Sequence, residues 1–332
     1  MTSRVRNAIA SLGAAFTIYG AARAADYLVV HVVRPRRGEV LAVSDMMLAA
    51  AFGVAIYLWL SLTATRVRIT GLERMQIIMD TQLALAAEIQ RRLLPSASAG
   101  SNGVRWAGRL EPALRIGGDF YDFIQVNDDD VFVVGDVSGK GIPASLLQAA
   151  AHSLFRTLAR ETVNPADLLT RISREVFAEN AGSSYLTCVV LRIDAAHRTL
   201  TYVNAGHPTG LMVGRSGRRL LSRGGPPAGL FPETIYEAEV VSLEDGDLGV
   251  IVSDGITEAM EEDGVPAADV LGRRVSGVPE PRTPQRVCDA LMEAAQRSPG
   301  PRGVANWQDD KTVFAFLFEG DRSPGAAITV SP

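Results

Sequence analysis

The sequence is poor in lysine and carries no excess of positive charge. Of its 33 basic residues only Lys140 and Lys311 are lysines, and the formal net charge is −4. This balance excludes the strongly basic surface of a nucleic-acid-binding protein, and we expect no nucleic-acid partner. Phosphoproteins and small molecules are left as candidate partners.

Cysteine is also scarce. Cys188 and Cys288 lie far apart in the sequence, each within an apolar stretch. This placement predicts two buried, reduced thiols rather than a disulfide or a zinc site.

The chain has 332 residues, 47% of them hydrophobic, which is enough for one large domain with an accessory segment.

Residues 1–68 differ sharply from the remainder in containing two long apolar stretches, and we expect them to form a membrane segment. Residues 46–65 carry no charge, over the length that a helix needs to cross a bilayer, and Arg66 and Arg68 follow directly. This pattern predicts a transmembrane helix. A buried helix of a soluble domain is the alternative.

A second apolar stretch, residues 8–33, precedes it. Arg23 and Asp26 interrupt this stretch, but they are three positions apart and can pair on one helix face. We therefore expect two membrane helices in a hairpin joined by the segment RPRRGEV. The arginines of that connector favour the opposite orientation, because basic loops prefer the cytoplasm, so the topology stays open.

Residues 69–95 show the periodicity of a helix with a short heptad seam. Its apolar positions are Leu72, Met75, Met79, Ala86, Ile89 and Leu93. The pattern predicts a linker helix that either forms a homodimeric coiled coil or packs on the following domain. Pro95 and the flexible-looking run SASAGSNG end it, and we place the domain boundary there.

Residues 104–320 combine strand-like apolar runs with helical stretches at 144–161, 165–178 and 284–297. Short turns join several of the runs, and there is no regular alternation of strand and helix. This predicts a layered α+β domain rather than a parallel β-α-β sheet. Residues 321–332 are predicted to be a disordered tail.

The aspartates at strand ends carry the chemistry. Asp136 and Asp254 directly follow apolar runs, Asp309 and Asp310 directly precede one, and Asp119 lies in GGDFYDF. Carboxylates that converge repel one another unless cations neutralise them, and Mg²⁺ or Mn²⁺ suits oxygen ligands. Two such ions about 3.5–4 Å apart can activate a water for in-line attack on phosphorus. Each aspartate alone is an ordinary turn or cap residue, but together they predict a metal site.

Five motifs, in this order, resemble metal-dependent phosphatases of the protein phosphatase 2C type: RIGGDFYDF, GDVSGKGIPASLL, YVNAGHPTGL, SDGITEAM and DDKTV. The branch they most resemble contains the SpoIIE sporulation phosphatase and the bacterial phosphatases of anti-anti-sigma factors. The segment EIQRRLLP resembles the helix before the catalytic domain in that branch. The resemblance covers about residues 85–319 and implies a four-layer α-β-β-α sandwich.

The resemblance also implies a binuclear centre of Mn²⁺ or Mg²⁺. Asp136 would bridge both ions, with the carbonyl of Val137 as a further ligand. Asp119 would bind the second ion, and Asp254 and Asp309 the first. Hydrolysis would use metal-activated water without a protein nucleophile, so Asp136 and Asp119 are the expected catalytic residues.

Other motif positions match without a settled role. Eukaryotic members carry a histidine two residues after the bridging aspartate, where this chain has Ser138, so the general acid stays open. The FG pair often found after the SDGITEAM motif is absent too. The supporting residues expected from the motifs are Asp122, Gly118, Lys140, His207 and Asp310.

The function implied by the resemblance is hydrolysis of phosphoserine or phosphothreonine on a signalling protein. A phosphorylated STAS-domain anti-anti-sigma factor is the expected substrate. The enzyme would be tethered to the bacterial inner membrane with a cytoplasmic catalytic domain. The alternative is an inactive membrane regulatory module that retains the fold, against which the presence of all four metal aspartates argues.

Overall fold

The chain divides into two compact units, residues 1–82 and 83–332. The predicted membrane helix at 8–33 lies outside the described residues except for Gly20, Ala21 and Arg23, and the predicted tail at 321–332 lies wholly outside them. The computed structural model describes residues 20–21, 23, 37–96, 98–101, 103–162, 164–298, 300 and 308–320.

One long helix, α2 (Arg37–Leu93), contains both the predicted span at 46–65 and most of the predicted linker at 69–95. It starts inside the predicted connector and continues without a break, because no proline interrupts it. Among the described residues it is the one helix long and apolar enough to cross a membrane.

The unit of residues 83–332 contains two six-stranded sheets, antiparallel apart from the short parallel pair β6–β9. The first sheet has the order β1-β2-β12-β11-β7-β8, and its strands are β1 (Ser98–Ser101), β2 (Val104–Glu111), β7 (Gly210–Gly214), β8 (Gly217–Leu221), β11 (Leu248–Val252) and β12 (Lys311–Phe318). The second has the order β10-β6-β5-β4-β3 with β9 beside β6, and its strands are β3 (Phe120–Val126), β4 (Asp129–Val137), β5 (Leu186–Asp194), β6 (Thr199–Ala205), β9 (Gly224–Gly225) and β10 (Glu239–Ser242).

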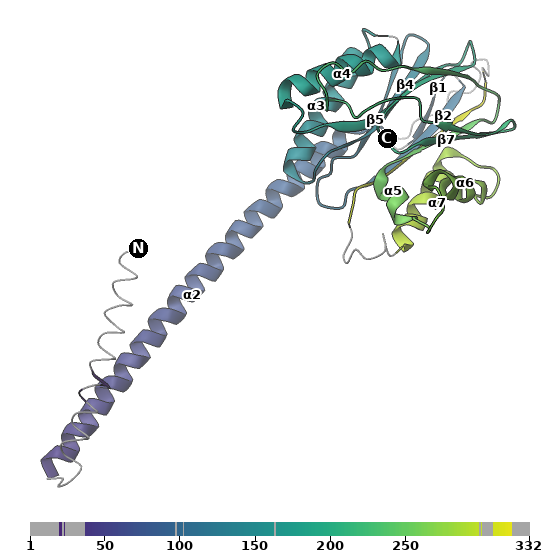
Figure 1. Cartoon of the computed structure of the whole chain (residues 1–332). Coiled ribbons are helices and arrows are strands. Elements are labelled where there is room, and N and C mark those ends of the chain that lie inside the picture. The colour runs from purple at the N-terminus through teal and green to yellow at the C-terminus, as the bar shows by residue number, and fades with distance from the viewer. Residues whose placement is uncertain are drawn as a thin grey trace. The chain divides into compact units, whose positions relative to one another are not determined.

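Two helices cover the second sheet and three cover the first (Figure 1). Side chains cap two of these helices: Asn164 Oδ1 accepts a hydrogen bond from the N–H of Ala166, and Thr283 Oγ1 accepts one from the N–H of Arg286. On the second sheet lie α3 (Ile142–Leu158) and α4 (Pro165–Asn180); on the first lie α5 (Asp254–Ala259), α6 (Ala267–Ser276) and α7 (Pro284–Arg297).

Three apolar cores separate these layers. The middle core lies between the two sheets and is rich in aromatic side chains, including Trp106, Phe132 and Phe314. The ring centroids of Trp106 and Phe314 are 5.9 Å apart, a favourable distance for stacked rings. The outer cores join each sheet to its own helices. The observed order of layers is therefore α-β-β-α, as expected.

The predicted flexible run after the linker is wrong in part. Ser98–Ser101 forms β1, which pairs with β2 along four residues. An edge strand gains its backbone hydrogen bonds from its neighbour, so small polar side chains do not prevent pairing. The last turns of α2, from Leu83, also belong to the same compact unit as the sheets.

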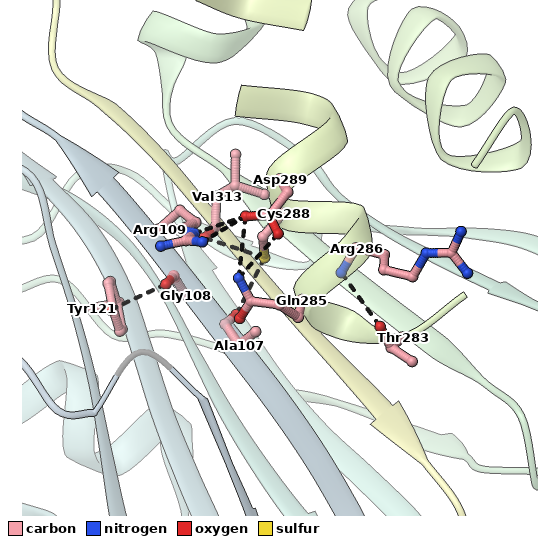
Figure 2. Close-up of polar contacts among 10 residues, drawn as sticks. All are labelled: Ala107, Gly108, Arg109, Tyr121, Thr283, Gln285, Arg286, Cys288, Asp289 and Val313. Carbon is pink, nitrogen blue, oxygen red and sulfur yellow. Dashed lines mark hydrogen bonds and ion pairs between the residues drawn. The ribbon is translucent and has the colours of Figure 1, made fainter. Parts of the chain in front are cut away.

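Helix α7 is fixed to the first sheet by polar contacts (Figure 2). The Cys288 thiol lies 3.4 Å from the carbonyl oxygen of Ala107, and Arg109 forms a 2.8 Å ion pair with Asp289. Cys188 and Cys288 are both free and buried, as the prediction of two buried cysteines without a disulfide required. Burial raises the pKa of each thiol, that of Cys188 to about 12, so both stay protonated.

Candidate active site

The predicted metal aspartates come from neighbouring strand ends. Asp136 is the penultimate residue of β4, and Asp119 directly precedes β3. Strands β3 and β4 are paired in the second sheet. Asp254 follows β11 as the first residue of α5, while Asp309 lies just before β12, the partner of β11 in the first sheet. Each sheet therefore contributes two carboxylates to one region.

Electrostatics show that these carboxylates are close together. Burial raises the pKa of Asp119 well above its usual value, with repulsion from Asp136 as the next cause. Burial and then repulsion from Asp254 raise the pKa of Asp136 to about 7. Burial and then Asp309 raise the pKa of Asp254. The protein thus holds a cluster of mutually repelling carboxylates, which cations would relieve.

Asp119 is the most buried member of the cluster. Its Oδ2 atom accepts a 2.6 Å hydrogen bond from the Thr312 hydroxyl, whereas its buried Oδ1 atom has no partner among the described residues. A buried carboxylate oxygen without a hydrogen-bond donor fits a place for a cation.

The cluster is an open one. Within the described ranges, no three His, Cys, Asp or Glu side chains lie close enough to enclose an ion by themselves. Mg²⁺ binds through one or two carboxylates and keeps several waters, so an open cluster of hard oxygen ligands still fits it.

Asp310 holds the loop that carries Asp119. Its Oδ1 accepts a hydrogen bond from the N–H of Ala113 and its Oδ2 one from the N–H of Gly118, both at 2.7 Å. A Cβ atom at Gly117 would lie 2.3 Å from the same carboxylate, so only glycine lets the loop approach this closely. Both Asp310 oxygens are therefore engaged with backbone groups.

Gly118 brings that loop against the end of β4. A Cβ atom placed there would lie 2.8 Å from the Val137 carbonyl oxygen and 3.1 Å from Asp136 Oδ1. The absence of a side chain therefore keeps this carbonyl and carboxylate next to the Asp119 loop.

Lys140 supplies a positive charge at the edge of the cluster. Its Nζ atom lies 3.0 Å from Asp309 Oδ2 and donates a 2.8 Å hydrogen bond to the Gln308 carbonyl. The half-exposed ammonium offsets part of the negative charge of the cluster and opposes the rise in the pKa of Asp254.

Comparison with known protein families shows which family the chain belongs to. The profile of the Stage II sporulation protein E (SpoIIE) family matches residues 128–319, more than half of the chain. The chain belongs to the SpoIIE family.

Its relatives and structural neighbours agree with this assignment. Phosphoserine phosphatase RsbU of Bacillus subtilis (strain 168) is 26% identical over 188 residues, which cover 56% of this chain and 56% of RsbU. The SiaA-PP2C domain of Pseudomonas aeruginosa superposes with a TM-score of 0.61 at 20% identity, covering 74% of this chain and 98% of that domain. RsbX, crystallised in complex with magnesium, has a TM-score of 0.51 at 16% identity, with 67% and 98% covered. The solved structures show a shared PP2C fold, and the chain spans about half the length or less of its curated relatives.

Asp122, expected in a supporting role, lies outside the carboxylate cluster of this SpoIIE-family chain. It is fully buried, and Arg156 donates to both of its oxygens at 2.7 Å. His152 Nε2 is 3.1 Å from it. Asp122 therefore ties β3 to α3.

His207 and Ser138 also have partners of their own. His207 is buried and its Nδ1 atom lies 2.9 Å from the Thr187 hydroxyl. The Ser138 hydroxyl accepts a 3.0 Å hydrogen bond from the Tyr185 N–H. Ser138 thus fastens the turn after β4.

Two residues of the site were missed by sequence reasoning. Thr312 is the fourth residue of the DDKTV motif, so the motif could have pointed to it. Gln90, within EIQRRLLP, bonds to the Gly117 peptide group in both directions: Nε2 donates to the carbonyl at 2.7 Å and Oε1 accepts from the N–H at 3.3 Å. A glutamine on a helix gives no signal of such a contact.

Proposed function

We propose that this SpoIIE-family chain is a metal-dependent serine/threonine protein phosphatase. The observation that supports this most is the convergence of four carboxylates at the ends of two sheets, where burial and then repulsion from neighbouring aspartates raise the pKa of Asp119, Asp136 and Asp254. RsbU, which shares the domain, is named a phosphoserine phosphatase. A catalytically inactive module would have no reason to retain this repelling cluster.

The site would hold two divalent cations, Mn²⁺ or Mg²⁺. The residues that would hold them are Asp119, Asp136, Asp254 and Asp309, with the Val137 carbonyl as a further ligand. When bound, such ions supply Lewis acidity and an activated water for in-line attack on phosphorus. Asp310 and Gly118 hold the Asp119 loop in place. Lys140, beside Asp309 at the edge of the cluster, would orient the phosphoryl group electrostatically.

The substrate class is a phosphorylated protein, and a STAS-domain anti-anti-sigma factor is the candidate. The family membership and the likeness to RsbU support this choice. The reaction would transfer the phosphoryl group to water and leave the free serine or threonine.

The direct test is phosphate release by the full chain, purified in detergent, from a phosphoserine-containing STAS protein with Mn²⁺. Asp136→Asn should lower the rate by about 10²-fold or more, since it removes the central carboxylate. Asp245→Asn, which changes an exposed carboxylate paired with Arg198, should leave the rate unchanged. Equal rates for the wild type and Asp136→Asn would overturn the proposal.

The end of α2 supports a regulatory role for the linker helix. Gln90 contacts Gly117, two residues before Asp119, and also donates a 3.0 Å hydrogen bond to Gln148 of α3. A cavity of about 340 Å³ beside this contact is lined by Leu94, Leu114 and Asp119, among others. A movement of this helix would therefore change the loop that carries Asp119. Gln90→Ala should lower activity without unfolding the protein, and an unchanged rate would exclude the coupling.

Exposed apolar side chains along α2 support the proposals that the chain is tethered to a membrane and forms a homodimer. Apolar side chains such as Phe52 and Trp59 are exposed along 46–65, and Met75 and Ile89 are exposed further along the helix. Exposed apolar stretches of this length fit a lipid or partner-helix environment. Membrane fractionation of the full chain, with a variant lacking 46–65 as comparison, tests the tether. If the full chain and the shortened variant are equally soluble, the membrane tether is contradicted. If light scattering shows that the full chain in detergent is a monomer, the homodimer is contradicted.

A further inference from the structure

His207 lies where the chain crosses from one sheet to the other. Strand β6 ends at Ala205 in the second sheet, and β7 begins at Gly210 in the first. The Asn204 carboxamide holds both backbone groups of His207, accepting from its N–H at 2.8 Å and donating to its carbonyl at 3.1 Å. The backbone of His207 is therefore held in place between the two sheets, which limits where its imidazole can lie.

One side of the imidazole faces the strand next to Asp136. His207 Nδ1 lies 2.9 Å from Thr187 Oγ1, and Thr187 of β5 is the register partner of Asp136 on β4. A single hydrogen bond and one strand pairing thus separate His207 from the central carboxylate of the cluster.

The imidazole also lies beside the strand that leads to Asp254. Strand β7 begins three residues after His207 and pairs with β11, and the backbone of Val252, the last residue of β11, is near enough to affect the pKa of the imidazole. Asp254 follows two residues later. His207 therefore contacts the strand beside Asp136 and lies next to the strand that leads to Asp254.

The imidazole works there as a neutral group. Burial lowers the pKa of His207 to about 3, with the Val252 backbone opposing the shift. Its Nε2 atom is buried and has no hydrogen-bond partner in the described part of the chain. A buried polar nitrogen left unpaired is costly, so a purely structural residue at this position would better be apolar.

We propose that His207 is a positioning residue that sets the spacing of Asp136 and Asp254, and thereby the affinity of the cluster for divalent cations. This inference rests on the proposed metal centre. His207 does not bind the cations itself; it acts through Thr187 on one sheet and through the end of β11 on the other. Groups that orient metal ligands typically change metal affinity by 10–100-fold when removed.

The test is a Mn²⁺ titration of the full chain in detergent, followed by the electron paramagnetic resonance signal of free Mn²⁺, so that no substrate is needed. His207→Ala should bind Mn²⁺ about tenfold more weakly than the wild type. Thr187→Val, a smaller change, should weaken binding in the same direction. His207→Gln, which keeps a hydrogen-bonding group, should recover part of the affinity.

Val275→Ala is the matched control for a general loss of stability. Val275 is fully buried on α6, in the outer core of the first sheet, and thermal melting would identify how far each variant is destabilised. If His207→Ala and Thr187→Val melt lower but bind Mn²⁺ as the wild type does, the inference is overturned while the metal centre stands. If Mn²⁺ binds neither the wild type nor Asp136→Asn, the proposed metal centre itself fails.

Discussion

The Asp310 carboxylate accepts a 2.7 Å hydrogen bond from the backbone N–H of Gly118, a residue 192 positions earlier in the chain. This contact ties the segment before β12 to the loop that carries Asp119. Because Asp310 also accepts from Ala113, one carboxylate fixes both ends of that loop. The carboxylate therefore organises the site without needing to bind an ion.

Asp310→Asn should loosen this loop. An amide has only one acceptor oxygen, so one of the two N–H groups loses its partner, at a cost of about 1–3 kcal/mol when buried. We expect the free energy of unfolding to fall by about 1 kcal/mol. The Mn²⁺ concentration for half-maximal activity should rise. Urea unfolding and a metal titration measure the two effects, and an unchanged metal requirement would show that the loop does not depend on Asp310.

Gly118→Ala should impair the site more than the fold. The added Cβ would lie 2.8 Å from the Val137 carbonyl oxygen, so the loop must shift away from the end of β4. We expect the Mn²⁺ concentration for half-maximal activity to rise at least tenfold, because groups that support the metal ligands are displaced. Gly100→Ala on β1, where the nearest atom is 3.6 Å away, is the control. Similar behaviour of the two variants would contradict the close approach.

Asp122→Ala should destabilise the protein without weakening metal binding. Asp122 is fully buried but the Arg156 side chain is 40% exposed, so the guanidinium left behind stays partly hydrated and the loss should be about 1–2 kcal/mol, less than for a fully buried pair. Adding Arg156→Met should restore part of the loss, and calorimetry on the three variants measures it. Weaker Mn²⁺ binding by Asp122→Ala would instead place this carboxylate in the metal site.

The metal-free protein should lose stability as pH rises through the range in which the cluster ionises. The pKa of Asp136 is about 7 in the folded protein and near 3.8 when unfolded, so between these values the folded state binds the proton more tightly. Its contribution to the free energy of unfolding therefore falls from about pH 4 to pH 7. In EDTA, Asp136→Asn should become more stable relative to the wild type as pH rises. A constant difference between them would contradict the repulsion, and Mn²⁺ should offset it in the wild type.

The α+β layers and the positions of Asp136 and Asp254 at strand ends were predictable from the sequence, because each aspartate directly follows an apolar run. Their role as metal ligands stays a prediction. Asp122 lies in the same motif as Asp119, but alternation along β3 sends it to Arg156 instead, which spacing alone did not reveal.

Contacts between segments that are distant in the sequence could not be predicted. Gln90 on a helix and His207 in a turn look ordinary, and their roles depend on which peptide group or hydroxyl lies opposite them. Strand β1 was missed because its pairing comes from the backbone of β2 rather than from its own side chains.

Counting bound Mn²⁺ by equilibrium dialysis tests the central claim most directly, because it needs no knowledge of the substrate. The full chain in detergent should bind two Mn²⁺ per chain. Asp254→Asn should lose one of them, and Asp136→Asn should lose tight binding of both. Wild-type binding that is absent, or equal in all three proteins, would contradict the metal centre formed by these aspartates.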